Sequence, residues 1–148
     1  MYSNSPRILC VEDHQDTLDL FVIVLSQLDY EVVTASTVQQ ALEAAKSQHF
    51  DLLVLDCRLC DGSGIDLCKR IRETDKTTPI LFCSALAYEK NKQEALNAGA
   101  QGYLVKPVSV SQMCETVAQL ISVSRQAMPL VHGEMRKDSG DLAPSMAV

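Results

Sequence analysis

The chain contains no cluster of lysine and arginine and no long apolar run. Its 13 Lys and Arg residues against 19 Asp and Glu residues give a formal net charge of -6. This balance argues against a broad electrostatic grip on nucleic acid, which needs a basic surface. No segment approaches the ~20 apolar residues of a membrane span, and the first residues lack the apolar stretch of a signal peptide. We therefore expect a cytoplasmic protein that binds neither nucleic acid nor membrane.

The cysteines give no sign of a disulfide framework. Two of the six, Cys10 and Cys83, lie inside predicted buried strands, where cysteine acts as a small hydrophobe. The pair Cys57-x-x-Cys60 has the spacing of a redox site or of half a zinc site. It lacks a second pair at zinc-finger spacing, and Cys68 is a single candidate third ligand. Structural cysteines are thus favoured over redox or zinc chemistry.

The order of apolar patterns predicts one α/β domain over residues 1–125. Short apolar runs alternate five times with segments of helical period, which is typical of a parallel sheet covered by helices on both faces. We expect a flavodoxin-like (βα)5 doubly wound sheet with strand order 2-1-3-4-5. The predicted strands lie near 7–11, 31–34, 51–55, 79–83 and 102–105. Periodicity stops after about Arg125, and residues 126–148 are expected to form a flexible C-terminal tail.

Local signals mark the ends of several predicted helices. Ser36 with Gln39, and Ser109 with Gln112, have the spacing of a capping box. Gly99 suits a helix C-terminus, which commonly takes a left-handed residue. The helix near 88–98 has little apolar surface, so we expect it to be weakly docked and available to a partner.

Polar side chains follow four of the apolar runs. Asp56 ends the run Leu52-Leu53-Val54-Leu55, and the other polar groups are Glu12-Asp13, Ser84 and Lys106. Parallel strands end at one edge of a sheet, and neighbouring first and third strands would bring the three carboxylates into one crevice. Three carboxylates repel one another, by up to about 4 kcal/mol per pair at ~4 Å. A positive group must compensate.

The chemistry that fits this crevice is phosphoryl transfer. Mg²⁺ binds through a few carboxylates and keeps water positions for a phosphate. Lys106 supplies a second positive charge and Ser84 a hydrogen-bond donor, and phosphoryl transfer depends mainly on positioning and charge neutralisation. Asp56 would be the nucleophile and form an aspartyl phosphate.

Over about residues 7–124 the chain resembles the receiver domains of two-component response regulators. The resemblance rests on motifs that occur in register along the chain: Glu12-Asp13, Asp56, Asp61-Gly62-Ser63-Gly64, Ser84-Ala85, Tyr103 and Lys106-Pro107. The glycines of the third motif are expected to permit a turn that other residues would strain. Each motif alone is weak, but the combination is specific.

The resemblance implies a metal site and a phosphoacceptor. Glu12, Asp13, Asp56 and the backbone carbonyl of Arg58 would bind Mg²⁺, with Mn²⁺ as a substitute. Asp56 would accept a phosphoryl group from a histidine kinase or a histidine phosphotransfer protein. No enzymatic activity is implied beyond this self-catalysed phosphorylation and dephosphorylation.

The resemblance also implies a switch. Ser84 and Lys106 would contact the phosphoryl group, and Ser84 and Tyr103 would change conformation with it. The peptide bond between Lys106 and Pro107 would be cis. The signal would reach an unknown downstream protein through the face made by the helix near 88–98, the strand at 102–105 and the helix beginning near 110. The protein would be a monomer or a phosphorylation-dependent dimer.

Three positions depart from the usual receiver pattern. Glu12 replaces a shorter aspartate, and we expect it to reach the metal through a water molecule. Cys60 stands where many relatives have proline, so the loop after Asp56 is expected to be looser. Arg58 and Leu86 lie near the acyl phosphate at positions that vary, which leaves the lifetime of the phosphorylated state open.

Two alternatives to a free-standing single-domain response regulator share features with this sequence. The chain would look the same if it were a receiver module cut from a hybrid histidine kinase or a larger regulator. An aspartate-nucleophile phosphatase of the haloacid dehalogenase type also uses Mg²⁺, a strand-end aspartate, a hydroxyl and a lysine. Its D-x-D signature is missing, because Arg58 stands two residues after Asp56, and no insertion is available to form a cap domain.

Overall fold

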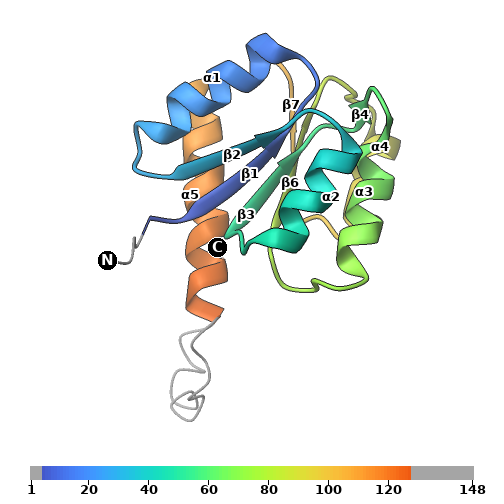
Figure 1. Cartoon of the computed structure of the whole chain (residues 1–148). Coiled ribbons are helices and arrows are strands. Elements are labelled where there is room, and N and C mark those ends of the chain that lie inside the picture. The colour runs from blue at the N-terminus through green and yellow to red at the C-terminus, as the bar shows by residue number, and fades with distance from the viewer. Residues whose placement is uncertain (1–4, 128–148) are drawn as a thin grey trace, which may run out of the picture.

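The computed structural model describes residues 5–127 and forms a single parallel sheet covered by helices on both faces (Figure 1). Five parallel strands make the sheet in the order β2-β1-β3-β6-β7. Their bounds are β1 (Arg7–Val11), β2 (Glu31–Ala35), β3 (Leu52–Leu55), β6 (Ile80–Ser84) and β7 (Gly102–Val105). The predicted flavodoxin-like order 2-1-3-4-5 is confirmed, with β6 and β7 as the fourth and fifth strands.

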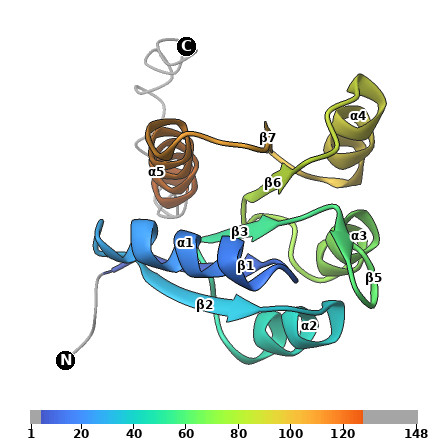
Figure 2. The same ribbon diagram turned by 90° about the horizontal axis from the view of Figure 1, so that it is seen from above.

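The helices divide between the two faces of the sheet (Figure 2). One face carries α1 (Gln15–Ser26) and α5 (Val110–Ala127), and the other carries α2 (Val38–Ser47), α3 (Gly64–Arg72) and α4 (Glu89–Ala98). None of the helices within residues 5–127 combines the length and hydropathy that a membrane crossing requires.

Successive side chains of each strand enter two separate cores. In β1, Leu9 and Val11 pack towards α2 and α3, whereas Ile8 and Cys10 pack towards α1 and α5. All four residues of β3 are buried, which explains why that strand reads as an unbroken apolar run. Both faces of β3 are buried, so a charged side chain fits only where the strand ends. Asp56 is the residue at that end.

A short hairpin that the apolar pattern did not predict follows β3. It pairs β4 (Arg58–Leu59) with β5 (Gly62–Ser63) in antiparallel register. Strands of two residues are too short to show a period in sequence. At the other end of the domain, α5 continues to Ala127, and the rest of the predicted tail lies outside the described residues.

Two helix starts differ in how they match the predicted caps. The cap of α2 is Thr37, whose hydroxyl accepts from the backbone N–H of Gln40, so the predicted cap at Ser36 is wrong by one residue. The side chain of Gln40 accepts instead from the N–H and the hydroxyl of Ser36, the residue before the cap. The Ser109 hydroxyl does accept from the N–H of Gln112, as half of the predicted box.

The end of α4 matches its prediction. Gly99 follows the helix with φ 116°, in the left-handed region. The helix buries Ala95 and Ala98, but Leu96 remains 43% exposed. The apolar contact that holds α4 to the sheet is therefore made mainly by two alanines.

Asp51 joins the first and last described elements at the edge of the sheet where the strands begin. Its carboxylate accepts from the backbone N–H of Arg7 at 2.8 Å and lies 3.4 Å from Nε of Arg125. The start of β1 and the last turns of α5 therefore meet at one edge, opposite to the edge where the strands end.

Candidate functional site

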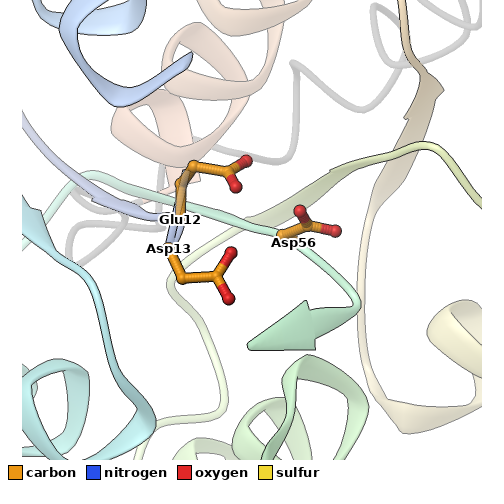
Figure 3. A group of neighbouring side chains, drawn as sticks. All are labelled: Glu12, Asp13 and Asp56. Atoms are coloured by element: carbon orange, nitrogen blue, oxygen red, sulfur yellow. The ribbon is translucent and has the colours of Figure 1, made fainter. Parts of the chain in front are cut away.

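Three carboxylates meet where β1 and β3 end (Figure 3). One oxygen atom from each of Glu12, Asp13 and Asp56 lies within 4.8 Å of the others. Glu12 is buried, Asp56 half-buried and Asp13 exposed. Within residues 5–127, this is the group of acidic, histidine or cysteine side chains that could hold a metal ion.

Strand register explains this convergence. β1 and β3 are paired so that Val11 lies opposite Leu55, and the ladder continues because the N–H of Asp56 donates to the carbonyl of Val11 at 3.2 Å. The N–H of Glu12 donates to the carbonyl of Ala35 at 3.0 Å in the neighbouring strand. The backbones that carry the carboxylates are thus fixed by the central strands of the sheet.

Lys106 brings a positive charge from the far side of the sheet. Its Nζ donates to Oε1 of Glu12 at 2.5 Å and to Oδ2 of Asp56 at 3.1 Å. Its backbone N–H donates to the carbonyl of Ser84 at 2.9 Å, and its peptide bond to Pro107 is cis. Burial alone would lower the pKa of Lys106, but the hydrogen bond to Glu12 and the charges of Asp56 and Glu12 outweigh burial and raise it.

Glu12 is held on both of its carboxylate oxygens. Oε1 accepts from Lys106, and Oε2 accepts from the backbone N–H of His14 at 3.1 Å. Burial raises the pKa of Glu12, although the bonds to Lys106 and His14 oppose the rise. No local sequence pattern indicated this pairing, because Lys106 lies 94 residues away.

The segment after Asp56 folds back tightly against it. The N–H of Gly64 donates to the carbonyl of Cys57 at 2.8 Å. A Cβ atom on Gly64 would lie 1.8 Å from the carbonyl oxygen of Asp56. Neither Gly62 nor Gly64 has a positive φ, but the prediction that another residue would be strained in this turn is confirmed at Gly64 by the nearby carbonyl. The glycine at 64 is required by close backbone approach rather than by an unusual dihedral angle.

Two side chains anchor the hairpin that begins beside Asp56. Asp61 accepts from the N–H of Val38, and Ser63 accepts from the N–H groups of Ile65 and Asp66 as the cap of α3. The side chain of Arg58 is exposed, and its backbone N–H lies 3.4 Å from Oδ1 of Asp56.

Tyr103 points its hydroxyl into the molecule. The hydroxyl donates to the carbonyl of Leu86 at 2.6 Å and lies 3.4 Å from Sγ of Cys57. Its ring stacks on Phe82 with a centroid distance of 6.1 Å. Burial, with the hydrogen bond to Cys57, raises the pKa of Tyr103. Cys57 and Leu86 are contacts that sequence reasoning missed, since neither side chain carries a charge that would single it out.

Ser84 lies at the end of β6, near the same turn. It is 1% exposed, and its hydroxyl accepts from the N–H of Leu86 at 3.2 Å. The side chains of Ser84 and Tyr103 therefore both bond to the backbone of Leu86. The Ser84 hydroxyl accepts from the N–H of Leu86, and the Tyr103 hydroxyl donates to the carbonyl of Leu86.

The cysteines take no part in the acidic cluster. All six are free. Cys57 is buried while Cys60 is exposed, although only two residues separate them. Burial raises the pKa of both Cys10 and Cys83 to about 12, so these thiols are protonated and behave as apolar groups.

Curated proteins with similar sequences include bacterial regulators. The chain is 34% identical over 138 residues to the nisin biosynthesis regulatory protein NisR of Lactococcus lactis, covering 92% of this chain and 60% of NisR. It is 34% identical over 132 residues to the alkaline phosphatase synthesis transcriptional regulatory protein PhoP of Bacillus subtilis, covering 89% of this chain and 54% of PhoP. The chain thus spans little more than half the length of these relatives.

Solved structures that superpose on this chain include receiver domains. A CheY-like response regulator receiver protein from Methanospirillum hungatei superposes with a TM-score of 0.81 at 27% identity, covering 84% of this chain and 99% of that one. The receiver domain of the sensor histidine kinase PA1611 of Pseudomonas aeruginosa, solved with a magnesium ion in its active-site cleft, has a TM-score of 0.74 at 28% identity. That match covers 80% of this chain and 98% of the Pseudomonas domain.

The family comparison agrees with these relatives. Residues 8–118, more than half of the chain, match the response regulator receiver domain. This range contains each strand of the main sheet apart from Arg7, together with the acidic cluster and Lys106. The chain therefore belongs to the response regulator receiver domain family.

Proposed function

We propose that this receiver accepts a phosphoryl group on Asp56 in a Mg²⁺-dependent reaction. The observation that carries the proposal is the cluster of Glu12, Asp13 and Asp56 within 4.8 Å, with Lys106 as the neighbouring positive charge. A free carboxylate bordered by a cation and an ammonium group can attack phosphorus, because both positive charges offset the charge that builds on the phosphoryl oxygens.

The donor set fits a hard divalent cation. Carboxylate and carbonyl oxygens are the ligands that Mg²⁺ takes in proteins, and Mn²⁺ accepts the same donors. Asp13 and Asp56, with the backbone carbonyl of Arg58, would hold the ion. Since both carboxylate oxygens of Glu12 already accept hydrogen bonds, its contact with the ion would run through water. The bound ion would offset the repulsion among the three carboxylates.

Lys106 and Ser84 would contact the phosphoryl group. Nζ of Lys106 lies 3.1 Å from Oδ2 of Asp56, so its ammonium group is within reach of an oxygen on a phosphoryl group carried there. The Ser84 hydroxyl can donate to a second oxygen once it turns from the N–H of Leu86.

The shared contact at Leu86 supports a switch made by Ser84 and Tyr103. When Ser84 turns towards the phosphoryl group, the N–H of Leu86 loses its acceptor, and the carbonyl of the same residue is the acceptor of Tyr103. A change at Ser84 would thereby alter the restraint on Tyr103 in β7. The surface that would respond is the face of α4, β7 and α5, where a downstream protein would bind or a second copy would dimerise.

The phosphodonor would be a histidine kinase or a histidine phosphotransfer protein in the cytoplasm. The chain covers 60% of NisR and 54% of PhoP, so the other parts of those regulators have no counterpart in the match. The proposed function is therefore that of a receiver module.

The experiment uses a small phosphodonor with Mg²⁺ and measures incorporated phosphate by intact mass. Wild-type protein is expected to gain one phosphoryl group that persists in acid, is lost in base and does not form when the metal is chelated. Asp56→Asn is expected to gain none. Asp51→Asn is the matched control, because Asp51 flanks the same strand at the opposite edge. Label that persists in Asp56→Asn would refute Asp56 as the acceptor.

A further inference from the structure

We propose that Asp61 is a positioning residue for the cation site. The residue lies at the tip of the β4–β5 hairpin, and its carboxylate accepts hydrogen bonds from the start of α2. It acts by holding the hairpin that carries the Arg58 carbonyl. This inference rests on the proposed function, since it assigns a residue that keeps the proposed cation site in shape.

The contact joins two segments that are far apart in sequence. Oδ1 of Asp61 accepts from the N–H of Val38 at 2.7 Å, and Oδ2 accepts from the N–H of Gln39 at 3.3 Å. These are the first two residues of α2, whose N–H groups have no partner within the helix. The hydrogen bond from Val38 lowers the pKa of Asp61, so the carboxylate is charged and complements the positive end of the helix.

A second observation shows how closely the tip of the hairpin approaches α2. A Cβ atom built on Gly62 would lie 3.2 Å from Cγ2 of Val38. The tip of the hairpin is thus packed on the first turn of the helix as well as bonded to it.

The remaining anchors hold the second half of the hairpin. Ser63 caps α3, and the N–H of Gly64 donates to the carbonyl of Cys57. The half that contains Arg58 is attached by its pairing with β5 and by the buried side chain of Leu59. Asp61 lies between the two halves, so its bonds to α2 fix the direction in which the first half leaves Asp56.

The sequence of the hairpin makes such a tie necessary. Residues 57–63 contain no proline, and Gly62 adds conformational freedom. Without a restricted backbone, a carbonyl oxygen on this segment would sample a range of positions. A cation that requires near-ideal octahedral geometry would then lose affinity.

The experiment compares Mg²⁺ binding by calorimetry in full-length wild type, Asp61→Ala, Asp61→Asn and Thr37→Ala. Thr37→Ala is the matched control, because it removes the other side-chain cap of α2 without touching the hairpin. Asp61→Ala is expected to weaken Mg²⁺ binding about tenfold, the lower end of what loss of a supporting contact does at metal sites. Asp61→Asn retains one acceptor oxygen, so its Mg²⁺ affinity should lie between those of wild type and Asp61→Ala. Thr37→Ala should bind as wild type does.

Amide hydrogen exchange in metal-free protein gives a second readout. Asp61→Ala should increase exchange at residues 58–60 as well as at Val38 and Gln39, whereas Thr37→Ala should affect α2 alone. Equal loss of Mg²⁺ affinity in Asp61→Ala and Thr37→Ala would overturn the inference in favour of plain helix stability. Wild-type binding retained unchanged in Asp61→Ala would overturn it too, leaving the proposed function intact. Wild-type protein that binds no Mg²⁺ would overturn both.

Discussion

Nζ of Lys106 lies 2.5 Å from Oε1 of Glu12, closer than the 3.1 Å that separates it from Oδ2 of Asp56. Glu12 is 2% exposed, so its carboxylate depends on this partner for most of its compensation. The pair joins the end of β1 to the end of β7 across the ends of β3 and β6, at the edge of the sheet that carries the acidic cluster. Lys106 therefore has a structural role before any phosphoryl group arrives.

Lys106→Met should destabilise the fold because it leaves the Glu12 carboxylate buried without its cation. We expect the free energy of unfolding near pH 7 to fall by about 2 kcal/mol, less than for a fully buried pair since Lys106 is partly exposed. Urea unfolding at constant ionic strength measures it. The double variant Glu12→Gln with Lys106→Met should recover most of the loss, and a double variant as unstable as the single one would contradict this explanation.

The loss of unfolding free energy in Lys106→Met should become smaller as the pH falls. Burial raises the pKa of Glu12, and removing Lys106 raises it further, so the folded protein favours the protonated acid. The loss of unfolding free energy in Lys106→Met is therefore absent below 4.5, the pKa of Glu12 in the unfolded chain. It is complete once the pH has risen through the pKa of Glu12 in the folded protein. The difference in unfolding free energy between wild type and Lys106→Met should narrow on acidification. A difference that is constant with pH would mean that the methionine itself packs badly.

Gly64→Ala should disturb the phosphoacceptor directly. Its Cβ would lie 1.8 Å from the carbonyl oxygen of Asp56, so the backbone at one of the two residues must move. We expect a loss of about 2 kcal/mol in stability, in the range for overpacked sites, together with slower phosphorylation by a small phosphodonor. Gly62→Ala is the control, because there the nearest atom is a side-chain methyl at 3.2 Å. Equal effects from the two substitutions would refute the steric explanation.

Tyr103→Phe should loosen the turn at Leu86 while keeping the aromatic stack on Phe82. The variant leaves the Leu86 carbonyl without its donor at 2.6 Å, and loss of such a hydrogen bond lowers stability by about 1 kcal/mol. Hydrogen exchange should show less protection of the Leu86 amide. Tyr88→Phe, at a side chain that is 78% exposed, should change neither quantity. Unaltered protection in Tyr103→Phe would remove Tyr103 from the proposed path between Ser84 and β7.

Asp75 should contribute stability only above acidic pH. Burial would raise its pKa, but hydrogen bonds from Thr78 and Thr77 outweigh burial and lower it below 3.8. A lowered folded pKa gives stability that is present above the unfolded value and lost as pH falls through the folded one. Asp75→Ala should therefore lower the unfolding free energy by about 1 kcal/mol near neutral pH, and less at low pH.

The control for Asp75→Ala is Glu73→Ala, at an exposed carboxylate two residues earlier. Its loss of unfolding free energy near neutral pH should be smaller than that of Asp75→Ala. A deficit in Asp75→Ala that does not shrink in acid would assign the stabilisation to packing instead of charge.

The sheet could be predicted from sequence because its strands are buried on both faces. Two of these strands are unbroken apolar segments in the sequence, from Leu52 to Leu55 and from Ile80 to Cys83. Their order is less constrained, because alternating strands and helices form more than one doubly wound order, of which the flavodoxin-like one was expected here. Once the order is known, the meeting of Glu12, Asp13 and Asp56 at one edge follows as well.

The details that escaped sequence reasoning depend on contacts between distant residues. The bond from Lys106 to Glu12 and the bond from Val38 to Asp61 span 94 and 23 residues, and neither leaves a periodic trace. The cap of α2 is Thr37 rather than Ser36, a shift of one residue that lies within the uncertainty of helix ends read from sequence. The requirement for glycine at 64 came from a neighbouring carbonyl rather than from its own dihedral angles.

The junction at Asp51, where the backbone of Arg7 and the side chain of Arg125 meet, has a practical consequence for handling the protein. Both described ends of the domain point away from the acidic cluster. A dye attached at either described end would therefore lie at the edge of the sheet opposite to the acidic cluster. The reactive edge would face the solution, open to a phosphodonor as large as another protein.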